Sequence, residues 1–178
     1  TRELARSGLL STNAARLRVL DFGAGLGAST LGLVYALRTA GFEGTIEAVL
    51  VDQDADALGL AKEILGTFPR TNVEVRTSLA GGMGAFDFLV MSQAISELDH
   101  EILDADARAL HHASMLLSMT KEHLVRSGAF IVVEPALRDR TRHLHRVRLR
   151  FRDPDRQVHP QQLRRVERRR GHLRVASV

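Results

Sequence analysis

A stretch near the amino terminus constrains the fold more than any other part of the chain. It reads Arg18-Val-Leu-Asp-Phe-Gly-Ala-Gly-Leu-Gly-Ala-Ser-Thr30. Val19–Phe22 suit a buried parallel strand, three glycines follow at alternate positions, and a helix-forming run begins at Ala28. Glycines let a ligand approach the backbone closely, and the first N–H groups of a helix attract its polar atoms. The stretch therefore predicts a nucleotide-like cofactor at the carboxyl end of the first strand of an α/β sheet.

Strand-like and helix-like segments alternate through the rest of the first 135 residues. We expect strands at 18–22, 46–51, 73–76, 86–91 and 129–133, and helices at 28–40, 55–65 and 106–125. This alternation predicts an α/β, Rossmann-like fold with a mostly parallel sheet, right-handed crossovers and helices on both faces. The strands that would complete such a sheet at its C-terminal side are expected to be missing or disordered.

Smaller signals predict where the helices begin and end. Asp54 or Asp56 is placed to cap the second helix, and Gly41 and Gly128 are expected to end the first and third helices. The inner face of the third helix is expected to consist of Leu110, Met115, Leu116, Met119 and Leu124.

The glycine stretch has three interpretations. Gly23-x-Gly25-x-x-Ala28 matches the dinucleotide fingerprint, which permits Ala at its last position. Asp21-x-Gly23-x-Gly25-x-Gly27 instead resembles the first motif of the Rossmann-like, class I S-adenosylmethionine-dependent methyltransferases. The third interpretation is a turn that only eases the packing of strand against helix. The acid before the first glycine and the strict alternation favour S-adenosylmethionine as the cofactor.

Asp52 lies at the carboxyl end of the predicted second strand. A carboxylate there faces the mouth of the glycine loop and can accept hydrogen bonds from both ribose hydroxyls of an adenosyl group. Asp54 and Asp56 are better placed to cap the helix, so capping does not account for Asp52. The same acid would also suit NAD. Asp52 therefore indicates an adenosine ribose, but it does not distinguish S-adenosylmethionine from NAD. Gln53 is expected to flank the adenine.

The resemblance to methyltransferases implies roles for residues after the third and fourth strands. Ser78 and Leu79 would contact the adenine, while Ser92 and Gln93 would lie where substrate and methionine moiety meet. Methyl transfer needs little beyond positioning, and the sequence shows no general base, so catalytic residues stay unknown, with Gln93 and Glu97 as candidates. The predicted cofactor-binding residues are Asp21, Phe22, Gly23, Ala24, Gly25, Gly27, Asp52, Gln53, Ser78, Leu79, Ser92 and Gln93.

A turn after the fifth strand narrows the resemblance. Glu134-Pro135 leads into a basic helix, and with Leu20–Thr30 and Val51–Leu58 it resembles the small-ribosomal-subunit methyltransferase-like family, related to mitochondrial ribosome assembly factors. The resemblance implies ribosomal RNA or the small ribosomal subunit as partner, and ribosome assembly or translation as the process. Several members carry a cysteine cluster near the carboxyl end, whereas this chain has no cysteine.

Charge changes abruptly along the chain. Residues 1–135 hold 11 Lys and Arg against 17 acids, whereas residues 136–178 hold 14 Arg against 4 acids. We expect residues 1–150 to form a truncated S-adenosylmethionine-binding methyltransferase domain and residues 151–178 to form an Arg-rich, poorly ordered tail. The arginines between 138 and 150 would form a basic helix face that binds RNA phosphates or is simply solvated.

Composition excludes several classes of site. Without cysteine there are no disulfides, Cys-ligated zinc or iron–sulfur clusters, and the eight His residues lack a ligand framework, so we expect them at the surface and no metal site.

No apolar run suits a membrane span and no signal peptide opens the chain, so no membrane partner and a cytoplasmic location are expected. The oligomeric state is not indicated.

Three functions remain after these exclusions. The first is an S-adenosylmethionine-dependent methyltransferase acting on small-subunit ribosomal RNA. The second is a catalytically silent S-adenosylmethionine-binding ribosome assembly factor, because the Asn/Asp-Pro-Pro-Tyr-like element of nucleic-acid amine methylators is absent. The third is an NAD-dependent oxidoreductase, which the lack of a Tyr-Lys pair or a His base disfavours.

Overall fold

The computed structural model describes residues 14–79, 82–99, 101–134, 138–152 and 176–177. The chain divides into two compact units. The first comprises Thr1–Ser92, Glu122–Val132 and Val175–Val178, and the second comprises Gln93–Lys121 and Val133–Arg174. Most of the predicted tail, residues 153–175, lies outside the described residues.

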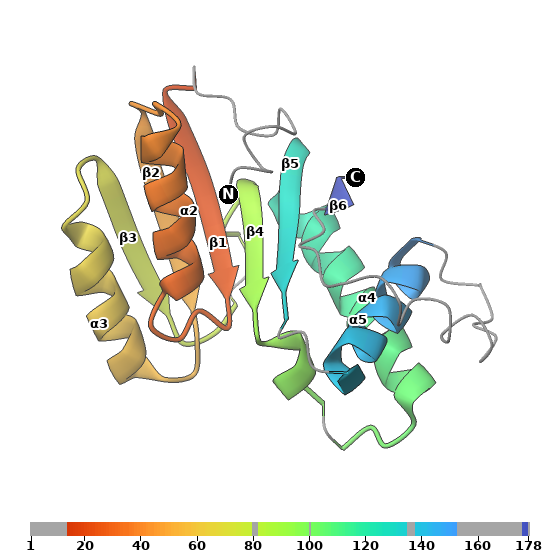
Figure 1. Ribbon diagram of the computed structural model, residues 1–178. Helices are drawn as coiled ribbons and strands as arrows, with labels where there is room; N and C mark the ends of the chain where they lie inside the picture. The colour runs from red at the N-terminus through yellow and green to blue at the C-terminus, as the bar shows by residue number, and fades with distance from the viewer. Residues whose placement is uncertain (1–13, 80–81, 100, 135–137, 153–175, 178) are drawn as a thin grey trace. The chain divides into compact units, whose positions relative to one another are not determined.

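The first unit is built on a six-stranded sheet with the order β3-β2-β1-β4-β5-β6 (Figure 1). Strand β1 pairs in parallel with β2 and β4, and β2 pairs in parallel with β3. The arrow of β5 runs in the same direction as that of β4, whereas β6 pairs antiparallel with β5. The strands are Arg16–Phe22, Thr45–Val51, Thr71–Arg76, Phe86–Ser92, Leu124–Val133 and Ala176–Ser177.

This topology confirms the predicted α/β, Rossmann-like fold. All five expected strands are present, and β3 lies at the sheet edge. The two-residue strand β6 lies beside β5, beyond the five strands that the sequence pattern predicts. Strand order reverses between β1 and β4, and in open α/β sheets ligands bind beyond the carboxyl ends of the strands at such a point.

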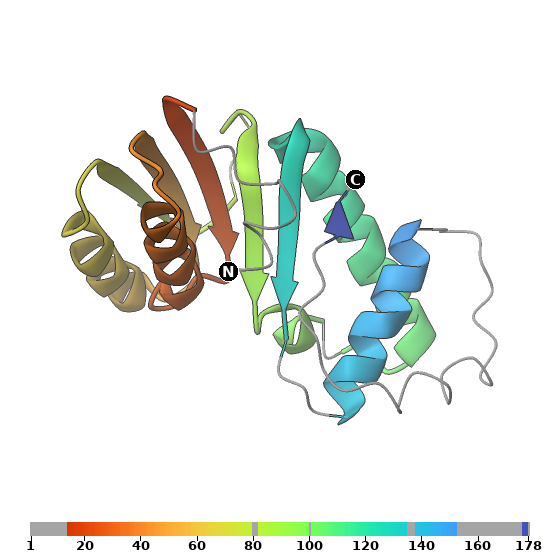
Figure 2. The same ribbon diagram turned by 45° about the horizontal axis from the view of Figure 1, so that its top comes forward.

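Two helices of the first unit, α2 (Ala28–Thr39) and α3 (Ala55–Gly66), cover the same face of the sheet (Figures 1 and 2). Apolar residues at helical spacing form their inner faces, and α2 contacts β1 and β4 while α3 contacts β3. The buried helical residues are Thr30, Leu33, Val34, Ala36 and Leu37 of α2 and Leu58, Ala61 and Leu65 of α3.

Local signals mark the ends of these helices as the sequence predicts. After α2, Gly41 has a φ of 88°, and its N–H donates to the carbonyl of Arg38 at 3.0 Å. Before α3, the Asp54 carboxylate accepts hydrogen bonds from the N–H groups of Asp56 and Ala57 at 3.0 and 2.9 Å. Both contacts satisfy backbone groups that a helix end leaves without partners, so these predictions are confirmed.

Arg38 joins the loops that lead into β2 and β3. Its Nη1 donates to the carbonyls of Phe42 and Gly44 at 2.7 and 2.8 Å, and its Nη2 donates to those of Pro69 and Arg70 at 2.8 and 3.1 Å. One guanidinium thus satisfies four carbonyl oxygens at the amino-terminal side of the sheet. No sequence motif announces this contact.

The second unit contains a short 3₁₀ helix, η1 (Ile95–Glu97), most of α4 (Ala105–His123) and α5 (Arg138–Arg152). The basic helix expected after the fifth strand is therefore present. On α4, Leu116 and Met119 are buried as predicted, but Leu110 is 41% exposed. The buried stripe of α4 consists instead of Ala109, His112, Ala113, Leu116, Met119 and His123.

The predicted end of the third helix at Gly128 is wrong. Helix α4 ends at His123, and β5 begins at once with Leu124, so Gly128 lies within a strand. A Cβ at Gly128 would come within 2.6 Å of Leu124 Cδ1 and 2.9 Å of the Asp87 carbonyl oxygen. Glycine is therefore required there for close approach between β5 and β4, rather than for a helix cap. Within the described residues, no helix is both long and apolar enough to cross a membrane.

We expect Gly128→Ala to destabilise the fold by about 1–3 kcal/mol, because its new methyl group would collide with backbone as well as side-chain atoms. The matched control is Gly32→Ala, on the exposed face of α2, where a Cβ meets nothing within 4 Å. That change should stabilise the protein by about 0.5–1 kcal/mol through helix propensity. Urea unfolding midpoints measure both, and equal effects of the two substitutions would contradict the close approach.

Candidate cofactor-binding site

The loop between β1 and α2 is a tight turn that depends on its alternate glycines. Gly23, Gly25 and Gly27 have φ angles of 70°, 50° and 71°, in the left-handed region that side chains disfavour. The N–H groups of Gly23 and Ala24 donate to the carbonyl of Val51 at 2.8 and 3.1 Å. The loop is therefore hydrogen-bonded to the last residue of β2.

Two of these glycines serve different ends. A Cβ at Gly27 would lie 3.1 Å from Ala61 Cβ and 3.3 Å from Leu65 Cδ1, so Gly27 lets the start of α2 pack closely against α3. A Cβ at Gly25 would meet nothing within 4 Å. Packing therefore explains Gly27, whereas Gly25 presents bare backbone to open space, as a loop that contacts a ligand would.

Asp52, the residue after β2, is fixed by two backbone donors. Its Oδ2 accepts a hydrogen bond from the N–H of Gly25 at 2.8 Å, and its Oδ1 accepts one from the N–H of Asp54 at 3.0 Å. A carboxylate can accept about four hydrogen bonds, so each oxygen keeps capacity for a ligand donor. The side chain is half-buried. The predicted ribose acid and the glycine loop thus form one hydrogen-bonded unit.

Asp21, in β1, is fully buried. Its Oδ2 accepts a hydrogen bond from Thr30 Oγ1 at 2.7 Å, while its buried Oδ1 has no partner in the part of the chain that the structure describes. Burial, together with the nearby charge of Asp52, raises the pKa of Asp21 from 3.8 to about 6, against hydrogen bonds from Thr30 that lower it. An orphaned carboxylate oxygen suits a ligand that brings a cation or an N–H donor. Thr30 is not among the predicted site residues, and its only signal in the sequence is a polar residue on the buried face of α2.

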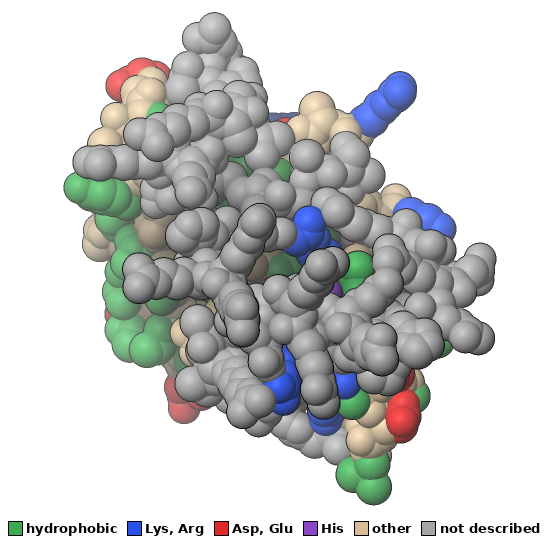
Figure 3. Space-filling model, turned by 45° about the vertical axis from the view of Figure 1, so that its right-hand side comes forward, with side chains coloured by type: hydrophobic (Ala, Val, Ile, Leu, Met, Phe, Trp, Pro, Cys, Tyr) green, Lys and Arg blue, Asp and Glu red, His purple; other side chains and the backbone are tan. Residues whose placement is uncertain are grey.

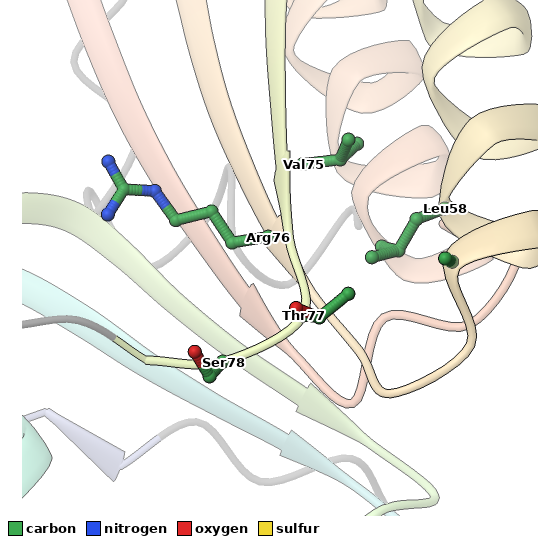
Figure 4. Close-up of a pocket in the computed structure, with 6 residues that line it drawn as sticks. Leu58, Val75, Arg76, Thr77 and Ser78 are labelled. Carbon is green, nitrogen blue, oxygen red and sulfur yellow. The ribbon is translucent and has the colours of Figure 1, made fainter.

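A hollow of about 430 Å³ lies beside α3 and the end of β3. In Figure 4, Leu58 and Val75 lie on one side of it, and the Arg76 side chain extends the other way, where its Nε contacts Glu74 Oε1 at 2.6 Å. Ser78, predicted to contact adenine, lines this hollow, whereas Leu79 does not. The lining residues are Ala55, Leu58, Val75, Arg76, Thr77 and Ser78.

Strand register brings the predicted residues of the first unit to one edge. Phe22 pairs with Val51 and with Met91, and Val51 pairs with Arg76, so β1 to β4 end side by side. The half-buried residues at or just beyond these ends include Phe22, Ala24, Leu79 and Ser92, whereas Gln53 and Ser78 are exposed. Direct hydrogen bonds join Gly23 and Ala24 to Val51 and Gly25 to Asp52, and the ligand contacts of all the predicted residues stay predictions.

The two catalytic candidates belong to the second unit. Gln93 has a φ of 56°, which is unusual for a residue with a side chain, and its N–H donates to the carbonyl of Val133 at 2.7 Å. Its side chain is exposed, as is that of Glu97 in η1. Strained backbone of this kind persists where the surroundings hold it and is concentrated at functional sites. The roles of both residues stay predictions.

The expected surface location of the His residues holds for His111, which is 54% exposed, but is wrong for His123, which is 8% exposed, and for His112 and His143. The last two are buried and contact each other, Nδ1 of His112 to Nε2 of His143, at 2.8 Å. Each lies on the inward face of its helix, whereas a polar side chain such as histidine is expected on the outward face. No group of three or more His, Asp or Glu side chains among the described residues is arranged to hold a metal ion.

Comparison with known proteins gives matches only at the level of structure. Neither a protein-family model nor a curated protein matches the chain. Similar solved structures include an S-adenosylmethionine-dependent methyltransferase from Aquifex aeolicus, with 21% identity and a TM-score of 0.49 over 75% of this chain and 62% of that one. PKMT2 from Rickettsia typhi, in complex with AdoHcy, has 19% identity and a TM-score of 0.47 over 84% of this chain and 27% of that one.

A third similar structure is the mycolic acid cyclopropane synthase CmaA1 complexed with SAH, with 13% identity and a TM-score of 0.49 over 74% of this chain and 40% of that one. The chain thus spans between 27% and 62% of the length of these three proteins.

We expect Asp21→Asn to remove a pH-dependent cost of folding. The pKa of Asp21 rises from 3.8 to about 6 in the folded state, so the stability that its protonated form contributes below about pH 4 is lost as pH rises through 6. The variant should be about 1–3 kcal/mol more stable than the original near neutral pH, with the difference vanishing near pH 4. Urea unfolding across this range tests it. Asp56→Asn, at an exposed position of α3, is the control, and a difference independent of pH would contradict the expectation.

Proposed function

We propose that this protein is an S-adenosylmethionine-dependent methyltransferase whose cofactor binds at the Gly23–Gly27 loop and Asp52. The observation that carries the proposal is the 2.8 Å hydrogen bond from the Gly25 N–H to Asp52 Oδ2. It supports a single site in which bare loop backbone faces the ligand and an oriented carboxylate accepts ribose hydroxyls. When bound, S-adenosylmethionine supplies an activated methyl group on its sulfonium.

Electrostatics favours this cofactor over NAD. Asp21 and Asp52 couple electrostatically, and one oxygen of Asp21 is buried without a partner among the described residues. A dinucleotide would bring the negative pyrophosphate to the glycine loop, close to two carboxylates, where like charges repel. S-adenosylmethionine instead brings a sulfonium and an ammonium group, whose positive charges these carboxylates stabilise.

The chain's own contribution to methyl transfer is positioning and exclusion of water. Alignment of a nucleophile with an activated methyl group removes most of the entropic cost of the reaction, so a general base is not required. Ser92 ends β4 and Gln93 follows it, and we propose that the substrate and the methionine moiety meet there. The left-handed backbone of Gln93, held by its hydrogen bond to Val133, supports a fixed orientation for this segment.

We further propose small-subunit ribosomal RNA as the substrate, which rests on the sequence resemblance and on the charge of α5. Seven of the 15 residues of α5 are arginines. Arginine binds phosphate through a planar pair of donors, and such contacts give RNA affinity that falls with salt. Basic side chains are visible at several places on the molecular face drawn in Figure 3.

Calorimetric titration with S-adenosylmethionine, S-adenosylhomocysteine and NAD tests the cofactor. We expect the first two to bind, and Asp52→Ala to weaken their binding by about 1–3 kcal/mol, the value of charge-assisted hydrogen bonds. Asp54→Ser, which keeps a capping side chain on α3, is the matched control and should bind as the original does. Unchanged affinity of Asp52→Ala would remove Asp52 from the site, and heat with NAD alone would overturn the proposal.

Transfer of a tritiated methyl group tests catalysis and substrate together. With saturating labelled cofactor, we expect incorporation into small-subunit ribosomal RNA that decreases steeply as salt rises. The control for cofactor dependence is Asp52→Ala, which is assayed at a cofactor concentration that saturates the unaltered protein. Cofactor binding without any incorporation into RNA would instead favour the catalytically silent assembly factor.

A further inference from the structure

Three side chains of the second unit form a hydrogen-bonded chain in which the two histidines are buried. His112 of α4 contacts Asp99 Oδ2 through Nε2 at 3.1 Å, and it contacts His143 Nε2 of α5 through Nδ1 at 2.8 Å. His112 has no exposed surface and His143 is 8% exposed. The two imidazole rings meet edge to face, with centroids 4.9 Å apart. Asp99, His112 and His143, here called the histidine junction, thus join the two helices.

The Asp99 carboxylate determines which ring nitrogen of each histidine carries a proton in the histidine junction. An ionised Asp99 only accepts, so the Nε2 of His112 carries a proton and its Nδ1 is an acceptor. The Nε2 of His143 must then donate to His112, which leaves the Nδ1 of His143 as a bare lone pair. That nitrogen is buried and has no partner in the described part of the chain. Both histidines are therefore neutral in the arrangement that the contacts require.

The surrounding charges oppose a proton on this pair. Arg108 of α4 and Arg146 of α5 act electrostatically on His143, and Arg146 pairs with Asp106 at 3.3 Å. Asp99 is the favourable charge for His112, but His111 shares its Oδ2 at 3.2 Å. Burial first, and then His112 and the two arginines, lower the pKa of His143 to about 4. Burial also lowers the pKa of His112, against the opposing effect of Asp99.

We propose that the histidine junction is a pH-sensitive contact that holds α5 against α4 at neutral pH and releases it on acidification. A proton added to the Nδ1 of His143 would be a buried charge without an acceptor, close to two arginines. The backbone of Asp99 has a φ of 52°, so the acid that orients His112 is itself held in a strained conformation. This inference stands apart from the proposed function, since it needs no cofactor.

The direction of the pH dependence follows from linkage. Because the pKa of His143 falls from 6.5 to about 4 in the folded state, the unfolded or opened state binds the proton more tightly. The stability of the junction is fully present above about pH 6.5 and is lost as pH falls toward 4. Opening of α5 should therefore become more frequent by roughly tenfold or more between about pH 7.5 and about pH 5.

Hydrogen exchange of the full chain, expressed as protection relative to an unstructured peptide at the same pH, tests this release. We expect protection of α5 amides to fall by roughly tenfold or more from about pH 7.5 to about pH 5, while protection of α2 amides in the same molecule does not fall. His143→Gln keeps an N–H donor for His112 but cannot titrate, so its α5 should lose the pH dependence. The matched control His111→Gln removes an exposed histidine that also contacts Asp99, and it should behave as the original.

Three results would overturn the proposal: no fall in α5 protection, an equal fall in α2, or an undiminished fall in His143→Gln. Because a variant at a buried position can fail to fold, imidazole titration by NMR on the unaltered chain provides a second measurement. The pKa of His143 should lie well below the ordinary value of a histidine, with its Nε2 protonated at neutral pH. Titration of His143 at the ordinary value of a histidine, near about pH 6.5, would refute the junction.

Discussion

The hydrogen bond between the Gly25 N–H and Asp52 joins the first strand, the glycine loop and the second strand into one structure. The loop can make this bond only because its backbone is left-handed at Gly23, Gly25 and Gly27. The packing of α2 against α3 depends on the same turn, since Gly27 admits Ala61 and Leu65. The geometry of the loop and the packing of the first unit are therefore not separable.

The carboxylates of Asp21 and Asp52 lower the stability of the fold through burial and mutual repulsion, and a ligand can offset this effect. Asp21 is buried and one of its oxygens has no partner among the described residues, so near neutral pH this edge carries a negative charge that burial disfavours. A positively charged ligand would neutralise it, and binding would then also stabilise the fold. Strain and unsatisfied polar atoms at functional sites are generally offset by packing elsewhere, which the buried cores of β1, β2 and β4 provide here.

Local sequence signals predicted the features that depend on neighbouring residues. The strands, the caps at Gly41 and Asp54 and the glycine loop follow from patterns within a few residues. Features that depend on distant contacts were missed or misread. Gly128 resembles a helix terminator until Asp87 is beside it, and His112 and His143 resemble surface residues until α4 and α5 meet. Thr30 and Arg38 likewise acquire their roles only from contacts with other parts of the fold. Thr30 donates to Asp21 of β1, and Arg38 donates to the carbonyl of Pro69.

The contacts of Arg38 and the proposed cofactor site lie at different edges of the sheet. The four carbonyl contacts of Arg38 lie with the loops that enter β2 and β3, whereas Gly25 and Asp52 follow the ends of β1 and β2. Parallel strands place these two sets of loops at opposite edges of the sheet. Sequence changes that alter ligand preference can therefore accumulate at one edge while the anchoring at the other is untouched. The first unit is in this sense a scaffold whose evolvable loops and structural anchor are kept apart.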